Sequence, residues 1–179
     1  MACNSIKSFT LDMCEGNVGG VSKIWLANES DVTAISAGTA STLTDEGIVS
    51  ITMSGDTKFV EFPIKKNTAN FTSTLNVSDN GSSYVSSVLA FNMPRMKADK
   101  RAAMQALMLS EALAIVLDSN GHYWMLGDKQ NPLTNTAGTG ETGTAKGDAN
   151  QYTTEMTAET PEWPMEIAAS AATAVIATE

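Results

Sequence analysis

The sequence predicts a mainly β protein, a single-domain β-sandwich or barrel with one packed α-helix at about residues 99–109. Segments of alternating polar and apolar residues recur along the chain, separated by turn-forming Gly, Asn, Asp and Pro. Only residues 99–109 combine a helix-starting residue with apolar side chains at helical spacing. The length of 179 residues suits one domain, 1–179, that can bury a core without staples.

The centre of the predicted fold is a β-hairpin. Residues 112–117 form an apolar run too short for a typical helix, and residues 118–121, Asp-Ser-Asn-Gly, can reverse the chain tightly. Residues 122–126 return with two aromatic side chains, which favour a half-buried strand. We therefore predict that Trp124, Leu117 and Val116 belong to the core.

The remaining chain divides into strands, an arm, a long loop and a tail. We expect an N-terminal arm at 1–20, a loop at 36–46, a structureless loop at 128–150 and a C-terminal tail at 168–179 that is frayed or lies on a neighbour. Ser54-Gly55-Asp56 is predicted to join its two flanking strands as a hairpin, with Pro63 marking an edge strand. Strands are expected at 21–26, 31–35, 48–53, 58–64, 67–77, 84–93 and 151–158, with at most an edge strand at 163–167.

The segment 67–77 alternates most clearly. One side carries short polar side chains and the other is at least partly apolar, as in a strand of a barrel wall. The polar set is Thr72, Thr74 and Asn76, and the apolar set, Phe71, Leu75 and Val77, is expected to pack on the core of the subunit.

The predicted helix begins with Asp99 as a candidate N-cap and presents apolar residues on one side. Its methionines, Met104 and Met108, are interpreted as core fillers. A single helix of this length covers one face of a β structure.

The predicted loop 128–150 is rich in Gly, Thr and Asn, with too few apolar residues to fold on itself. Its pattern Gly-Thr-Gly-Glu-Thr-Gly matches a dinucleotide fingerprint, but it neither leaves a buried strand nor opens a helix, so a nucleotide site is not indicated. We interpret the segment as disordered in a monomer and ordered by a neighbouring subunit. Its candidate inter-subunit residues are Thr136, Gly138, Gly140, Glu141, Gly143 and Lys146.

The charge is acidic but uneven. The net charge is −9, made of −5 over residues 1–56, +4 over 57–110 and −8 over 111–179. Overall acidity argues against tight nucleic-acid binding, which needs clustered Lys and Arg. The asymmetry fits either contacts between subunits or two solvated faces of a monomer.

Two further features bear on the compartment. Cys3 and Cys14 are interpreted as reduced thiols, and residues 1–11 lack the apolar core of an export signal. No stretch approaches the length of a membrane span, so no membrane partner is expected.

Catalytic residues are not indicated. His122 is the only histidine, lies next to a turn and is expected to be exposed without a partnered base. One His and two distant Cys make no zinc site. The acidic pairs Asp45-Glu46 and Glu159 with Glu162 match no known calcium or hydrolytic spacing. The sequence therefore predicts no enzyme, no metal and no cofactor.

Three stretches together carry a resemblance: residues 14–20 (CEGNVGG) before the first strand, 115–124 (IVLDSNGHYW) and 138–152. In their residues and in their order along the chain, these stretches resemble the tail tube (major tail) proteins of tailed bacteriophages, of the type found in phages of gut Bacteroidetes. The resemblance spans most of the chain and rests on general layout, not on a diagnostic motif.

The resemblance implies a virion structural protein that assembles into stacked, hexameric rings in the bacterial host cytoplasm. In that family strands of each subunit join into an inner barrel, and double-stranded DNA passes through it during ejection without tight binding. The partners implied are the protein itself and other tail proteins. Thr72, Thr74 and Asn76 would then face the lumen, and the lysines of 57–110 would not be expected there.

Two other classes remain open from the sequence. One is another virion component, such as a connector, head decoration or fibre-base protein. The other is a carbohydrate-binding β domain, in which Trp25, Trp124 and Trp163 would form an exposed stacking platform. The position of these tryptophans discriminates between them, because burial favours a structural protein and an exposed row favours sugar binding.

Overall fold

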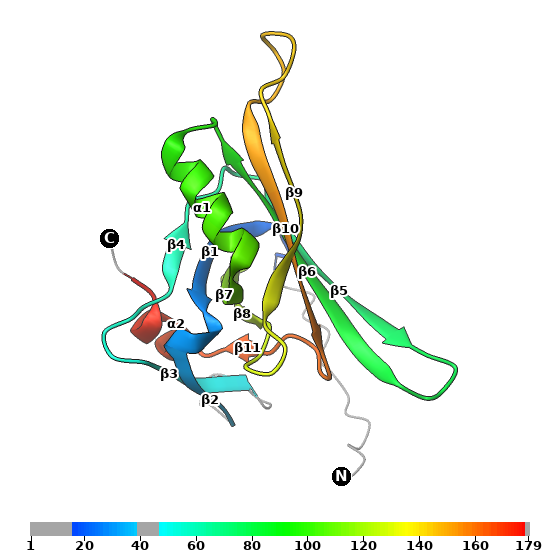
Figure 1. Cartoon of the computed structure of the whole chain (residues 1–179). Coiled ribbons are helices and arrows are strands. Elements are labelled where there is room, and N and C mark those ends of the chain that lie inside the picture. The colour runs from blue at the N-terminus through cyan, green and yellow to red at the C-terminus, as the bar shows by residue number, and fades with distance from the viewer. Residues whose placement is uncertain (1–15, 39–46, 178–179) are drawn as a thin grey trace.

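A computed structural model describes residues 16–38 and 47–177 (Figure 1). The predicted cysteine thiols, most of the N-terminal arm, the pair Asp45-Glu46 and much of the loop 36–46 lie outside these ranges. The protein is mainly β and sandwich-like, and its sheet does not close into a barrel among the described strands. The predicted β-sandwich with a packed helix is confirmed.

The strands run through one branched sheet. In chain order the elements are β1 (Val21–Asn28), the 3-10 turn η1 (Glu29–Asp31), β2 (Val32–Gly38), β3 (Gly47–Met53), β4 (Val60–Phe62), β5 (Ala69–Val77), β6 (Ser83–Pro94), α1 (Ala98–Leu109), β7 (Glu111–Asp118), β8 (Tyr123–Leu126), β9 (Leu133–Glu141), β10 (Gln151–Thr160), β11 (Glu166–Ile167) and α2 (Ala169–Val175).

β7 is the strand at which the sheet branches. It pairs along its length with β1, and on its other side with β8 and, at residues 111–112, with β9. From β7 the sheet continues in one direction through β8, β11, β3 and β2, and in the other through β9, β10, β6 and β5. The hairpin predicted at the centre of the core is confirmed, with Val116 opposite Trp124.

Two buried clusters lie on opposite faces of β7. The inner core lies between β1 and β7 on one side and β5, β6, β10 and α1 on the other; it includes Ile24, Val116, Leu89, Met156 and Leu107. The outer core lies beneath β2, β3, β11 and α2; it includes Trp25, Ile115, Ile48, Ile167 and Val175. Because alternate side chains of a strand point to opposite faces, β7 needs an unbroken apolar run to serve both cores.

Residues 168–177 of the C-terminal tail pack on the body of the protein. α2 buries Ala171, Ala172 and Val175 against the outer core, and Phe59 bridges to Ile176. Small alanines allow this short helix to lie close to β3. The prediction of a free or neighbour-bound tail was wrong because a small apolar face has no periodicity that tells intramolecular from intermolecular burial.

Two strand pairings also differ from prediction. The turn at residues 54–56 does not make a hairpin, because β3 pairs with β2 and β11 whereas β4 pairs with β1. β11 lies between β3 and β8, so it is not an edge strand. β4 does end before Pro63 and pairs on one side only, as the proline predicts.

The predicted helix is present, but its start differs. Lys97 occupies the N-cap without a side-chain hydrogen bond, and Asp99 lies in the first turn, where a carboxylate favours the positive end of the helix dipole. Leu107 is its only residue among the buried positions, and Met108 is 59% exposed. The interpretation of Met108 as a core filler was therefore wrong, while Met104 packs partly buried on the inner core.

Candidate functional site

Strands β9, β10, β6 and β5 form one wall of the sandwich, here called the four-strand layer (Figure 1). All three of its pairings are antiparallel and nearly uninterrupted, so neighbouring side chains line up in rows across it. One side of the layer packs on the inner core. The other side, the bare face, has neither helix on it, because α1 packs on the core side of β9 and α2 packs on β3.

The bare face carries the predicted lumen residues. Thr72 and Thr74 are exposed and Asn76 is partly exposed. Register places Thr72 beside Val88 and Val88 beside Thr157, which are outward positions of β6 and β10. The outward residues of β10, missed as site residues although its alternation was predicted, are Thr153, Glu155, Thr157 and Glu159.

Hydroxyl groups link neighbouring strands of the bare face. Thr139 and Thr153 lie with their Oγ1 atoms 2.6 Å apart, and the Oγ1 atoms of Thr136 and Thr157 are 3.0 Å apart. Cross-strand pairs of this kind stabilise a sheet without adding charge. Thr136, predicted as a loop residue, thus belongs to the same surface as Thr72.

The charges of the four-strand layer are all negative. Across β5, β6, β9 and β10 the charged residues are Glu141, Glu155 and Glu159, with no Lys or Arg. The basic residues of 57–110 lie outside β5 and β6, at 58, 65–66 and 95–101. On these four strands a polyanion therefore meets threonines, a few carboxylates and small apolar side chains such as Val88 and Ala90, and no cation.

The long loop predicted at 128–150 is wrong as a structureless segment. Its middle is β9, which pairs with β10 from Thr134 to Glu141. Gly138 and Gly140 lie within this strand, and a Cβ on Gly140 would stand 2.8 Å from the Tyr152 ring. These glycines were taken as a sign of flexibility, but they make room for side chains on the core side.

Residues 142–150, between β9 and β10, form a turn. Gly143 has φ +70°, and Asp148 accepts hydrogen bonds from the backbone N–H groups of Thr144 and Ala145 at 2.8 and 2.7 Å. These two bonds hold the pKa of the Asp148 carboxyl below its usual value. Lys146 lies exposed in the same turn. This turn closes the far end of the β9–β10 hairpin, which extends away from the body (Figure 1).

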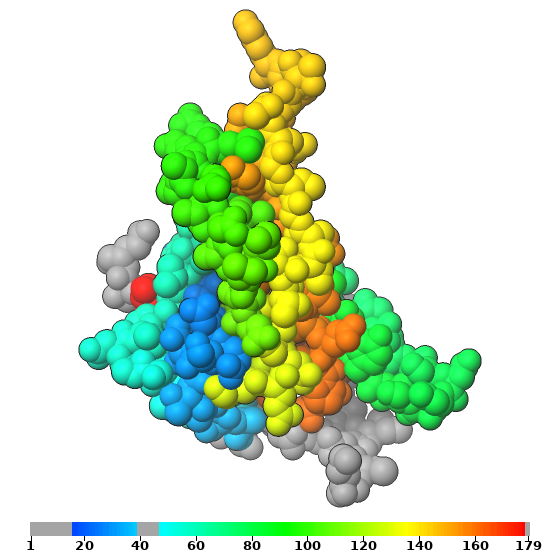
Figure 2. All heavy atoms as spheres, in the orientation of Figure 1, coloured from blue at the N-terminus to red at the C-terminus, as the bar shows by residue number. Residues whose placement is uncertain are grey.

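The β5–β6 hairpin extends beyond the body of the molecule (Figure 2). On its core side Leu75 is 51% exposed and Val77 is 69% exposed. The prediction that this apolar face packs on the subunit core was therefore wrong beyond Phe71, which contacts Trp124 with ring centroids 6.4 Å apart. The alternation correctly predicts which side is apolar, but no part of the described chain covers its end.

The tryptophans do not form a row. Trp25 is 3% exposed, Trp124 is half-buried and Trp163 is 56% exposed. Trp124 Nε1 donates a hydrogen bond to Asp118 Oδ2 at 3.1 Å. Of the predicted core set, Val116 is fully buried, whereas Leu117 and Trp124 lie at its margin.

His122 is exposed, as predicted, but it has a carboxylate partner, which was not predicted. Its Nδ1 lies 2.7 Å from Glu166 Oε1, which ties the β7–β8 turn to β11. Asp118 accepts hydrogen bonds from the backbone N–H groups of Asn120 and His122. Burial acts to raise the pKa of Asp118, but the hydrogen bonds from His122, Trp124 and Asn120 outweigh it and leave this pKa lowered.

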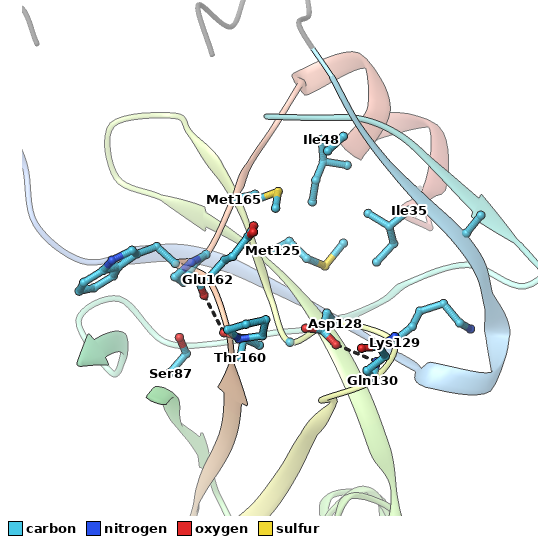
Figure 3. A pocket seen from close by; sticks show the side chains of 16 residues that line it. Ile35, Ile48, Ser87, Met125, Asp128, Lys129, Gln130, Thr160, Glu162 and Met165 are labelled. Atoms are coloured by element: carbon cyan, nitrogen blue, oxygen red, sulfur yellow. Dashed lines mark hydrogen bonds between the residues drawn. The ribbon is translucent and has the colours of Figure 1, made fainter. Parts of the chain in front are cut away.

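A pocket of about 470 Å³ opens between β2–β3 and the end of β10 (Figure 3). Ile35, Ile48, Met125 and Met165 give it an apolar lining, and Thr160 Oγ1 donates to Glu162 O across its rim at 2.7 Å. Its polar groups include no paired nucleophile and base. It can hold an apolar group, and nothing in its geometry indicates a reaction.

Within residues 16–38 and 47–177 no group of three or more His, Cys, Asp or Glu side chains is placed to hold a metal ion. No helix in the same ranges is long and apolar enough to cross a membrane. Comparisons of the chain with protein-family models, with curated proteins and with solved structures find no match. Support for a function therefore comes from the bare face and from the resemblance in sequence.

Proposed function

We propose that this protein is the structural subunit of a phage tail tube, a stacked-ring conduit in which the bare face lines the channel for DNA. The observation that carries the proposal is the four-strand layer, whose bare face is continuous and has no Lys or Arg on its four strands. Its outward side chains are mostly polar, with Val88, Ala90 and Ala137 among them. Phosphate groups find no cation to hold them there, so DNA can pass instead of binding.

The ends of the layer support assembly. β5 has a strand partner on one side only, and β9 has none on its outer side beyond Thr134 among the described strands. β5 contains no charge and no proline, so it lacks the features that keep edge strands from pairing with another chain. Such a layer can continue from one copy to the next and close its edges in a ring.

The direct test is negative-stain electron microscopy of the purified protein. Tubes or stacked rings of constant diameter are expected. Single rings that never stack would instead favour a connector, and particles that decorate capsids would favour a head protein. A monomer at all concentrations would contradict the proposal.

The channel assignment has its own test. Lysines at Thr72 and Thr74 would place rings of positive charge on the bare face, where each can contact phosphate. Particles carrying T72K/T74K are expected to assemble but to release DNA more slowly at low salt, with recovery as salt is raised. Ser170→Lys adds a charge to α2, away from this face, and should leave release unchanged. Normal release of DNA from the double variant at low salt would show that β5 does not line the channel.

A further inference from the structure

The described surface holds two largely apolar features that no other part of the described chain covers, and each carries a single charge, Asp79 on one and Arg101 on the other. One is the end of the β5–β6 hairpin, where residues 71–87 contain a single charged residue, Asp79. Leu75 and Val77 lie exposed there. The other is a groove of about 280 Å³ between α1 and β9, with Met104 and Met108 on its helix side. In a protein of net charge −9, surfaces with so few carboxylates are where two copies can approach with the least repulsion.

Strand direction makes these two features meet. The three antiparallel pairings make β9 and β5, at opposite margins of the layer, run in opposite directions. When two layers lie side by side with their bare faces in the same direction, β5 of one copy therefore meets β9 of the next in antiparallel orientation. Antiparallel pairing needs only the unpaired backbone groups that both edges offer.

Side-chain direction then brings the apolar groups together. Leu75 is paired with Val85, which is buried and lies on the same side of β6 as the inner-core residue Leu89. Leu75 therefore lies on the core side of the layer, and Val77 lies on the same side two residues on. α1 lies on that same side of β9, since Met104 Cε would be 3.1 Å from a Cβ on Gly138. The hairpin of one copy would thus lie along the groove of the next.

The floor of the groove is built from glycines. Gly138 and Gly140 occupy the core-side positions of β9 that border the groove, and neither has a side chain to fill it. The unpaired strand edge, the glycine floor and the half-exposed Met108 lie next to one another. Together they form a shallow apolar site beside a strand that can accept one more neighbour.

We propose that β5 of one copy pairs with residues 135–141 of β9 in a second copy, and that Leu75 and Val77 fill the groove against Met104 and Met108. The occupant is a second copy of this chain, and the contact is heterologous, so it continues into a ring or a filament. This inference rests on the proposed assembly and specifies its subunit interface.

Cross-linking between two differently tagged copies tests the inference. One copy carries Leu75→Cys and the other Met108→Cys, both with Cys3→Ser and Cys14→Ser to remove other thiols, and a short bismaleimide is added after mixing. A mixed dimer is expected at least tenfold above that formed when Val60→Cys replaces Leu75→Cys. Val60 is a matched control because it is 57% exposed and lies on β4, away from the hairpin.

The outcomes separate the interface from the function. Tubes or rings without a 75–108 cross-link would overturn this interface and leave the tail-tube proposal standing. A 75–108 cross-link in particles that are neither rings nor tubes would support the interface and overturn the function. Monomers that give no cross-link would overturn both. Leu75→Asp should abolish assembly of a chain that still unfolds at the parent urea midpoint, whereas Val60→Asp should assemble.

Discussion

β7 and the far end of β5 are both strands with apolar side chains, but their surroundings are opposite. β7 has a buried core on each of its faces, and Ile115 is 0% exposed. At the end of β5, the side chains of Leu75 and Val77 are 51% and 69% exposed. The buried apolar residues hold the monomer together, and in the proposed assembly the exposed ones contact a neighbouring subunit.

The largest difference is expected in monomer stability. Ile115→Ala removes a fully buried side chain and should lower the free energy of unfolding by about 4 kcal/mol, within the usual range of 2–5 for such truncations. Leu75→Ala should change it by less than about 0.5 kcal/mol, as at exposed positions. Urea unfolding at a concentration where the protein is monomeric measures both. Equal losses would mean that the hairpin end is covered in the monomer.

A smaller effect is expected where α1 and β10 crowd β9. Gly140→Ala places a Cβ 2.8 Å from the Tyr152 ring and should destabilise the protein by about 1–3 kcal/mol through overpacking. Gly147→Ala, where no atom lies within 4 Å of the new Cβ, is the matched control and should stay near neutral. If G140A is as stable as G147A, β9 does not pack as described.

The smallest expected effect is on the loss of stability at low pH. The pKa of Asp118 is lowered below 3.8 in the folded protein, so its carboxylate adds stability above the unfolded pKa and loses it as the pH falls through the folded pKa. Asp118→Asn should therefore flatten the fall in stability below about pH 4. Thermal unfolding between pH 2.5 and 7 measures this. An unchanged pH profile would show that Asp118 does not contribute to the loss of stability at low pH.

Much of the fold could be predicted where a local pattern has one structural meaning. The continuous apolar run of β7, the Asn-Gly turn after it and the alternation of β10 each indicate the element that is present. The partner of a strand is harder to predict. β4 follows β3 after a turn, yet it pairs with β1, because tertiary packing and not the turn residues decides the pairing.

The candidate site was predicted in part for the same reason. Alternation in β5 predicts Thr72 and Thr74 on a polar face, and they lie there. Gly138 and Gly140 were interpreted as loop residues because glycine in a strand and glycine in a loop look alike in sequence. Their meaning depends on the Tyr152 ring and on Met104, which approach from β10 and from α1. In the proposed assembly, a second copy covers Leu75, and no local sequence pattern can specify such a contact.

Cryo-electron microscopy of the assembled protein tests the central claim most directly, because it shows which surface faces the lumen. We expect a tube whose inner wall is β5, β6, β10 and β9, with Thr72, Glu155 and Glu159 facing the channel and both helices on the outside. A tube in which the bare face points outward, or is buried between subunits, would contradict the account.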